Sequence, residues 1–84
     1  MELHLIYTDS NIVLSKKKYG DWIQIQEDFP DYKTSLGPWS LDEMIDFLKD
    51  EYDNLLPSAS AQVNELSNSS LITKELSYDL PPVS

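Results

Sequence analysis

Polar and apolar residues alternate along much of the first third of the chain, with the period of two that is typical of β-strands. Three segments show this alternation: residues 2–7, 12–18 and 21–27. In the first of them Leu3, Leu5 and Tyr7 form one apolar face, and turn residues follow each of the first two segments. We therefore expect three antiparallel strands in a meander. Residues 29–37 contain Pro30 and precede a second proline, so they are expected to form an irregular crossover.

The pattern becomes helical after Trp39. Ser40 is a good N-cap, and Glu43 follows three positions later, as in the reciprocal capping box. Apolar residues then recur at intervals of three and four, and Trp39 is placed to pack toward Met44. Because the residue before a proline avoids the α region, the helix is expected to end at about Leu56.

These elements predict a small α+β protein of order β-β-β-α, in which an antiparallel sheet of three or four strands is covered on one face by a single amphipathic helix. Residues 1–56 are interpreted as the folded domain. Residues 57–84 contain many Ser, Asn and Pro residues and are interpreted as a partly ordered carboxy-terminal segment. Within it, residues 71–79 alternate well enough for a fourth strand or a docked tail, and Pro81-Pro82 favours a polyproline-like end.

The chain is strongly acidic for its 84 residues, with 15 Asp and Glu, six Lys, no Arg and a formal net charge of −9. Residues 41–56 alone carry six acids and one lysine. This balance disfavours direct binding to nucleic acid or anionic lipid, because such binding depends on Lys and Arg. It favours rapid, salt-sensitive encounters with cationic proteins. The equally weighted alternative is that the charge only keeps the protein soluble.

The residues that carry most enzyme and metal chemistry are scarce. The chain has no Cys, one His and two Gly, so thiolate nucleophiles, Cys-ligated zinc and Gly-rich phosphate loops are not available. His4 is expected to be a partly exposed strand residue. A weak alternative is a hard-cation site at Glu27, Asp28 and Asp31, whose spacing matches no calcium loop. We therefore predict no enzyme, no cofactor and no metal.

Other features concern the location of the protein and its basic residues. The absence of Cys favours a reducing compartment, and the chain has neither a signal-like start nor an apolar run of about 20 residues, so we expect a cytoplasmic protein that does not cross a membrane. Lys16, Lys17 and Lys18 form the one basic cluster. It is interpreted as a solubilising device at a strand end, with contact to phosphate as the less favoured alternative.

The predicted helix carries an acidic stripe, defined as the five carboxylates that fall within an arc of roughly 100° on a helical wheel. They are Asp42, Glu43, Asp46, Asp50 and Asp53. Lys49 is placed to meet Asp46 and Asp53, so repulsion between like charges is largely uncompensated. The stripe is interpreted either as a mimic of a nucleic-acid backbone or as a complement to a basic active site. The plain alternative is a solvated surface.

Two aromatic residues are candidates for the desolvated anchor of an interface: Trp22, on the sheet face away from the helix, and Tyr52. We therefore predict a non-enzymatic protein that binds and inhibits a larger basic protein, and mimicry of nucleic acid by the stripe would make that partner a nucleic-acid-binding enzyme. In size and composition it is similar to the small acidic inhibitors among phage anti-defence and bacterial immunity proteins, although no motif supports the resemblance. The alternative is an accessory subunit that docks through the sheet face and the carboxy-terminal tail.

Overall fold

The first two strands form the hairpin that their alternating residues predict. The computed structural model describes residues 1–78, and in it β1 (Glu2–Thr8) pairs antiparallel with β2 (Ile12–Ser15). The hydroxyl of Thr8 accepts a hydrogen bond from the N–H of Asn11 at 3.0 Å, which closes the turn. The second strand ends at Ser15, earlier than predicted, so the three lysines that follow lie outside the sheet.

The prediction of a third strand at residues 21–27 is wrong, because this segment forms α1 (Trp22–Asp28). The carboxylate of Asp21 accepts hydrogen bonds from the N–H groups of Ile23 and Gln24, at 3.1 and 3.2 Å, and so caps the helix. Ile25 is the buried residue of the helix. The alternating apolar residues in this segment therefore do not form one buried face, because only Ile25 is buried.

The third strand of the sheet is β3 (Tyr32–Ser40), in the segment that was predicted to be an irregular crossover. It pairs antiparallel with β1, where Leu3 lies opposite Trp39, and the register shifts between Leu3 and Leu5. Gly37 lies at this irregularity with a φ of +109°, and a Cβ there would come within 2.6 Å of the Leu3 carbonyl oxygen. Gly37 thus marks a bulge within this strand.

The helix α2 (Leu41–Glu51) begins as predicted. The Ser40 hydroxyl accepts a hydrogen bond from the N–H of Glu43, and the Glu43 carboxylate accepts one from the N–H of Ser40, both at 3.2 Å. This reciprocal pair confirms the capping box. Trp39 packs on Phe47, with 5.0 Å between the ring centroids.

The predicted end of this helix at Leu56 is wrong, because α2 ends at Glu51. Tyr52 adopts extended backbone angles, with φ −132° and ψ 111°. The extended chain then lets Leu55 form a β-bridge with Tyr78, and the Leu56 N–H donates to the Ser77 carbonyl at 3.2 Å. Pairing with a distant segment therefore replaces the last predicted helical turn.

The described part of the carboxy-terminal segment contributes α3 (Ala59–Asn68) and β4 (Thr73–Glu75). The Ser58 hydroxyl caps α3 by accepting a hydrogen bond from the N–H of Ala61 at 3.3 Å. The strand β4 pairs antiparallel with β2, which confirms the fourth strand. Residues 79–84, with the predicted polyproline-like end at Pro81-Pro82, lie outside the described residues. The division of the chain into residues 1–56 and 57–84 stays a prediction.

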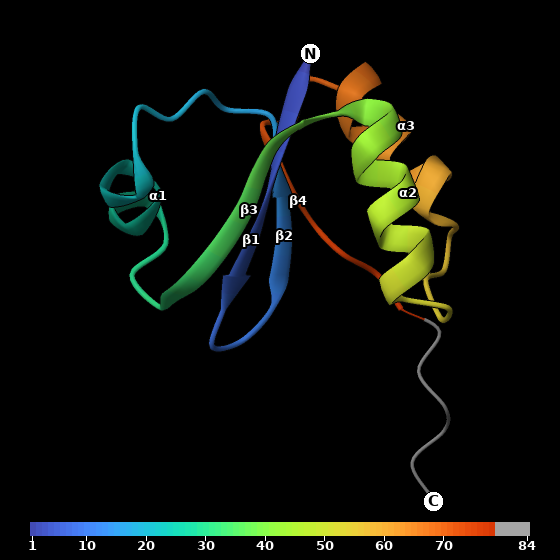
Figure 1. Ribbon diagram of the computed structural model, residues 1–84, viewed down its shortest axis with the longest axis horizontal. Helices are drawn as coiled ribbons and strands as arrows, with labels where there is room; N and C mark the ends of the chain where they lie inside the picture. Colours follow the sequence, from blue (N-terminus) through green and yellow to red (C-terminus); the bar gives the residue numbers. More distant parts are fainter. Residues whose placement is uncertain (79–84) are drawn as a thin grey trace, which may run out of the picture.

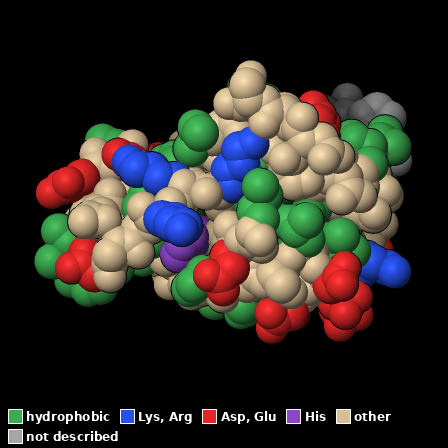
Figure 2. Space-filling view, turned by 90° about the horizontal axis from the view of Figure 1, so that it is seen from above, with side chains coloured by type: hydrophobic (Ala, Val, Ile, Leu, Met, Phe, Trp, Pro, Cys, Tyr) green, Lys and Arg blue, Asp and Glu red, His purple; other side chains and the backbone are tan. Residues whose placement is uncertain are grey.

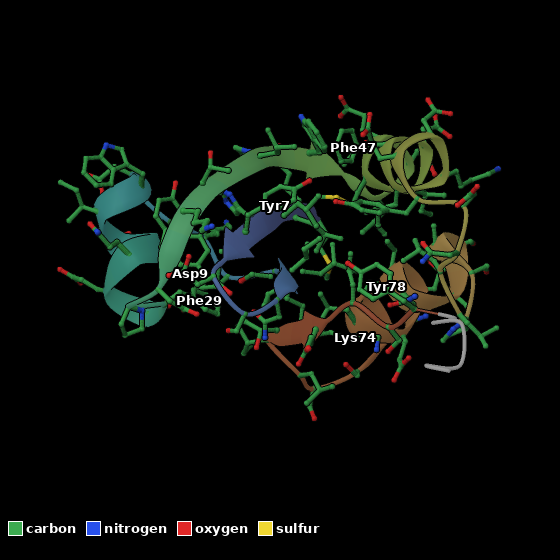
Figure 3. The ribbon with its side chains drawn as sticks, turned by 90° about the horizontal axis from the view of Figure 1, so that it is seen from below. Tyr7, Asp9, Phe29, Phe47, Lys74 and Tyr78 are labelled. Atoms are coloured by element: carbon green, nitrogen blue, oxygen red, sulfur yellow. The ribbon has the colours of Figure 1, made fainter. Side chains whose placement is uncertain are left out.

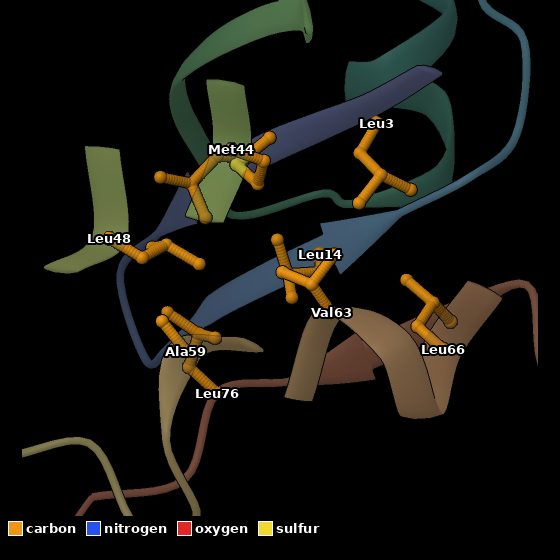
Figure 4. Close-up of a cluster of buried hydrophobic side chains, with 9 residues drawn as sticks. Leu3, Leu14, Met44, Leu48, Ala59, Val63, Leu66 and Leu76 are labelled. Atoms are coloured by element: carbon orange, nitrogen blue, oxygen red, sulfur yellow. The ribbon is translucent and has the colours of Figure 1, made fainter. Parts of the chain in front are cut away.

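The strand order is β3-β1-β2-β4, and helices lie on both sides of the sheet (Figure 1). The single covering helix of the prediction is therefore replaced by α2 and α3 on one face and α1 on the other. Figure 4 shows the larger buried cluster, beneath α2 and α3. Its buried members are Leu3, Leu5, Leu14, Met44, Leu48, Ala59, Val63, Leu66 and Leu76.

A smaller cluster lies on the opposite face, where Ile6 and Val13 pack with Ile25 of α1. Leu5 and Ile6 thus point to different sides of the sheet, as the period of two requires. None of the helices within residues 1–78 combines the length and the apolar character needed to cross a membrane.

Candidate functional site

The structure places four residues of the acidic stripe on one exposed side of α2: Asp42, Glu43, Asp46 and Asp50. The opposite side of the helix buries Met44 and Leu48 in the larger cluster. Asp53 is also exposed, but it follows the end of the helix, so helical geometry does not fix its position relative to the other four. Figure 2 shows acidic side chains gathered over α2.

The negative charge of the stripe is not balanced by ion pairs among the described residues. The three ion pairs within residues 1–78 are Lys17–Asp28, Lys33–Asp9 and Lys74–Glu65, and none of them involves the stripe. Lys49, which was placed to meet Asp46 and Asp53, lies within 4.0 Å of neither carboxylate. The stripe therefore presents its carboxylates to solvent with their charge uncompensated.

The structure does not bring the two predicted anchors together at the stripe. Trp22 is 57% exposed, but it opens α1, on the other side of the sheet from α2 (Figure 1). Tyr52 adjoins the end of α2 and is half-buried, with its hydroxyl 3.2 Å from that of Tyr7 and its ring packed edge-on against Tyr78. Burial, reinforced by the Tyr52 hydroxyl, raises the pKa of Tyr7.

Sequence reasoning missed another aromatic pair, Trp39 and Phe47, which lies beside the stripe. Phe47 follows Glu43 by four residues and precedes Asp50 by three, so it adjoins both on the helix surface. Both rings are partly buried against the larger cluster. Figure 3 shows Phe47 on α2. The spacing of Phe47 from Glu43 was available in the sequence, but the position of Trp39 beside it depends on the end of β3.

A second group of charged and aromatic residues, which includes Lys16, Lys17 and Tyr19, lies at the end of the sheet where β1 begins and β2 ends. The Lys16 ammonium donates hydrogen bonds to the carbonyls of Leu66, at 2.8 Å, and Ser69, at 2.6 Å. It thereby binds the carboxy-terminal end of α3, where unpaired carbonyls carry partial negative charge. Lys17 pairs with Asp28 at 2.6 Å. Lys16 therefore has a structural role in addition to the solubilising role expected of the cluster.

Two cavities open at this end of the sheet. The larger has a volume of about 630 Å³ and is lined by Lys16, Lys17, Lys18, Tyr19, His4, Glu2, Met1 and Pro38. The smaller, of about 240 Å³, lies against α1 and the bulge of β3, and Trp22 and Gly37 are among its lining residues. His4, Tyr19 and Pro38 line both cavities.

His4 is more deeply buried than a partly exposed strand residue, because only 9% of its surface is exposed. Its ring meets that of Tyr19 edge-on, with 5.0 Å between centroids. Burial lowers the pKa of His4, and the nearby negative charge of Glu2 opposes that effect. The imidazole is therefore neutral at pH 7, with one nitrogen as a donor and the other as an acceptor.

Two of the three carboxylates proposed as an alternative cation site, those of Asp28 and Asp31, are engaged with other partners. Asp28 pairs with Lys17, and Asp31 accepts a hydrogen bond from the Ser10 hydroxyl at 2.9 Å. Within residues 1–78 no group of three or more His, Asp and Glu side chains is arranged to hold a metal ion.

Comparisons of the chain with protein-family models, with curated proteins and with solved structures find no match. Functional inference therefore depends on the two surfaces described above. One is the acidic stripe with its neighbouring aromatic pair, and the other is the lysine-lined end of the sheet.

Proposed function

We propose that this is a non-enzymatic protein that binds and inhibits a larger basic protein through the acidic stripe. The observation that carries the proposal is the set of exposed carboxylates on α2 without an ion-pairing partner among the described residues. Adjacent like charges destabilise a helix by about 0.2–0.5 kcal/mol per pair. A cationic partner relieves that repulsion on binding, and so gains affinity from it.

The helix suits this role because its position is fixed before binding. The capping box holds its first turn, and Met44 and Leu48 hold its inner side in the core. Carboxylates four residues apart are separated by about one helical turn, which gives a regular row of negative groups. Such a row resembles a nucleic-acid backbone in charge, so the favoured partner is a nucleic-acid-binding enzyme of a phage-defence or toxin type.

The aromatic pair beside the stripe supplies the apolar part of the proposed interface. Phe47 follows Glu43 by one helical turn, Trp39 packs on Phe47, and Tyr52 precedes Asp53 in the chain. Aromatic side chains next to carboxylates favour Arg on the partner, since its guanidinium binds a carboxylate and stacks on a ring. Trp22 belongs to a different surface and is not part of this interface.

The test compares three tagged proteins in pull-downs from bacterial lysate at low and high salt, with the captured proteins identified by mass spectrometry. The stripe variant carries Asp46→Asn, Asp50→Asn and Asp53→Asn. It keeps Asp42 and Glu43, because Glu43 completes the capping box. The control variant carries Glu27→Gln, Glu65→Gln and Glu75→Gln, which remove the same charge from exposed positions elsewhere.

We expect the wild type and the control variant to capture the same basic protein at low salt and to release it at high salt. The stripe variant should not capture it, and the captured protein's activity should fall when wild-type protein is added. Equal capture by the stripe variant would remove α2 from the mechanism.

A second function has one observation in its favour. Leu71 and Ile72, next to β4, are 50% and 52% exposed, and Leu56 is 60% exposed. An accessory subunit that docks through the carboxy-terminal segment would bury these side chains. Such a complex resists high salt, whereas a complex steered by charge does not. Comparing capture at low and at high salt in the same pull-down therefore distinguishes the two functions.

A further inference from the structure

The two cavities at the end of the sheet adjoin one another and share His4, Tyr19 and Pro38 as lining residues, so we consider them together as one surface groove. We call it the lysine–tryptophan groove, after the residues at its two ends. Its lining residues include none from α2 and none from the acidic stripe. Figure 2 shows lysine side chains and the single histidine together on this end of the molecule.

One end of the groove is cationic. Lys16, Lys17 and Lys18 are half of the six lysines in the chain, and all three line the larger cavity. Lys16 uses two of its three N–H groups on carbonyls of α3, and Lys17 keeps one carboxylate partner, Asp28. Lys18 is exposed and forms no ion pair within residues 1–78. This end therefore offers N–H donors that are not used in the fold.

The His4 ring lines both cavities and forms no hydrogen bond with the described residues. The residue is nine-tenths buried. Every fully enclosed side-chain nitrogen or oxygen atom in residues 1–78 does have a partner. The His4 nitrogens are therefore not fully enclosed, and they reach the space of the cavities that His4 lines. Because these nitrogens are accessible and form no hydrogen bond with the described residues, they are available to a ligand.

The other end of the groove is aromatic. Trp22 lines the smaller cavity and is 57% exposed, which is unusual for so large an apolar side chain. Gly37 and Pro38, at the bulge of β3, also line this cavity. An exposed indole beside an open cavity is suited to stacking on a planar ring.

We propose that the lysine–tryptophan groove binds a small ligand with a phosphate at one end and a planar ring at the other, of the class of a nucleoside monophosphate. The lysines bind the phosphate, His4 bonds a polar group in the middle, and the ring stacks on Trp22. The larger cavity, at about 630 Å³, is within the usual range of about 300–1,000 Å³ for small-ligand sites.

Negative charges limit the affinity and the kind of ligand. Glu2 lines the lysine end and Asp21 lines the tryptophan end, so a polyanion meets repulsion at both. The net charge of −9 adds repulsion at long range. A single phosphate beside the lysines avoids most of this repulsion, whereas a nucleic-acid strand does not. We therefore expect a dissociation constant in the millimolar range that rises with salt.

The test is a titration of the isotope-labelled, full-length protein, followed by two-dimensional NMR. The probes are the four ribonucleoside 5′-monophosphates, adenosine, inorganic phosphate and a short single-stranded oligonucleotide, each added alone. The chain has two Trp, so it has two indole N–H signals, which a Trp22→Phe variant assigns. Trp39 packs on Phe47 outside the groove and serves as an internal reference.

We expect at least one nucleoside monophosphate to move the Trp22 indole signal and the amides of residues 16–21 in a saturable way, while the Trp39 indole signal stays in place. A Lys17→Ala, Lys18→Ala double variant should bind at least tenfold more weakly. The control is Lys33→Ala, Lys49→Ala, which removes the same charge at exposed positions outside the groove and should bind as the wild type does.

Several results would overturn the proposal. If no monophosphate gave a saturable shift, the proposed site would be excluded. If the lysine double variant bound as tightly as the wild type, the proposed contact between the lysines and the phosphate would be excluded. If adenosine bound as tightly as adenosine monophosphate, the cationic end would have no role. If inorganic phosphate bound as tightly, Trp22 would have none. Tighter binding of the oligonucleotide would replace the small ligand with a nucleic acid.

Discussion

The side-chain amide of Gln62 forms hydrogen bonds with both backbone groups of Ser77. Its nitrogen donates to the Ser77 carbonyl and its oxygen accepts from the Ser77 N–H, both at 2.9 Å, and the nitrogen also donates to the Pro57 carbonyl at 2.7 Å. Gln62 is fully buried. It therefore acts as a neighbouring strand would, and joins α3 to the segment after β4.

Replacing Gln62 by Leu should lower the free energy of unfolding by about 2 kcal/mol, because it leaves the Ser77 N–H and the Pro57 carbonyl without their partner. Urea denaturation measures the change. The matched control is Asn64→Leu, at an exposed position of the same helix, which should change stability little. Equal losses in the two variants would show that the bonds to Ser77 contribute nothing specific.

The Gly37→Ala variant should lose about 1–3 kcal/mol of stability, because a side chain at φ +109° is strained and its Cβ lies 2.6 Å from the Leu3 carbonyl oxygen. Gly20→Ala is the control, since a Cβ there meets only the flexible Gln24 side chain, at 3.3 Å. Thermal unfolding of both variants tests the prediction. A Gly20 variant as unstable as the Gly37 variant would contradict it.

Stability should fall as the pH rises above the usual tyrosine pKa of about 10. Burial and the contact with Tyr52 raise the pKa of Tyr7, so above pH 10 the folded state keeps a proton that the unfolded chain releases. The free energy of unfolding then decreases with pH. In the Tyr7→Phe variant this decrease should be shallower, which denaturation curves between pH 8 and 11 would measure. An unchanged slope would show that Tyr7 does not titrate abnormally.

Acid should weaken the fold for a related reason. Burial lowers the pKa of His4 below its usual value of 6.5, against the opposing effect of Glu2, so below that value the unfolded chain binds a proton that the folded state does not. The stability contributed by neutral His4 is present above pH 6.5 and is lost as the pH falls. His4→Gln should flatten the dependence between pH 7 and 5. A wild-type His4 titration by NMR at or above 6.5 would contradict the prediction.

Neutralising the centre of the acidic stripe should stabilise the protein. Asp46 lies four residues from both Asp42 and Asp50, so Asp46→Asn removes two like-charge pairs, each worth about 0.2–0.5 kcal/mol. Urea denaturation at low salt should show the gain, and it should shrink at high salt because of screening. Lower stability of the variant at low salt would show that the stripe is not strained by its own charge.

The sequence was sufficient where one local pattern determined the structure. The first hairpin, the capping box of Ser40 and Glu43, the fourth strand and the exposure of the α2 carboxylates were all predictable. Each depends on alternation, helical period or capping within about ten residues. The same reasoning failed for α1, because Ile23 and Ile25 are two residues apart, which favours a strand. In the structure only Ile25 is buried, and Asp21 caps the helix.

The remaining errors arise from contacts between distant parts of the chain. Residues 29–37 were predicted to form an irregular crossover, yet pairing with β1 makes a strand that includes Gly37 and Pro38. Tyr52 ends α2 early because the residues after it pair near Tyr78. The lysine–tryptophan groove could not be predicted, since His4, Lys18 and Trp22 come together only when β1, the loop after β2 and α1 are assembled.

The strand order leaves one edge of the sheet open while the chain is being synthesised. The central strands β1 and β2 are made first, but β4, which covers the free edge of β2, is the last described element to leave the ribosome. Until then the hydrogen-bonding edge of β2 is open, and such edges pair readily with other chains. A nascent or truncated chain that lacks β4 is therefore the form of this protein most prone to aggregation.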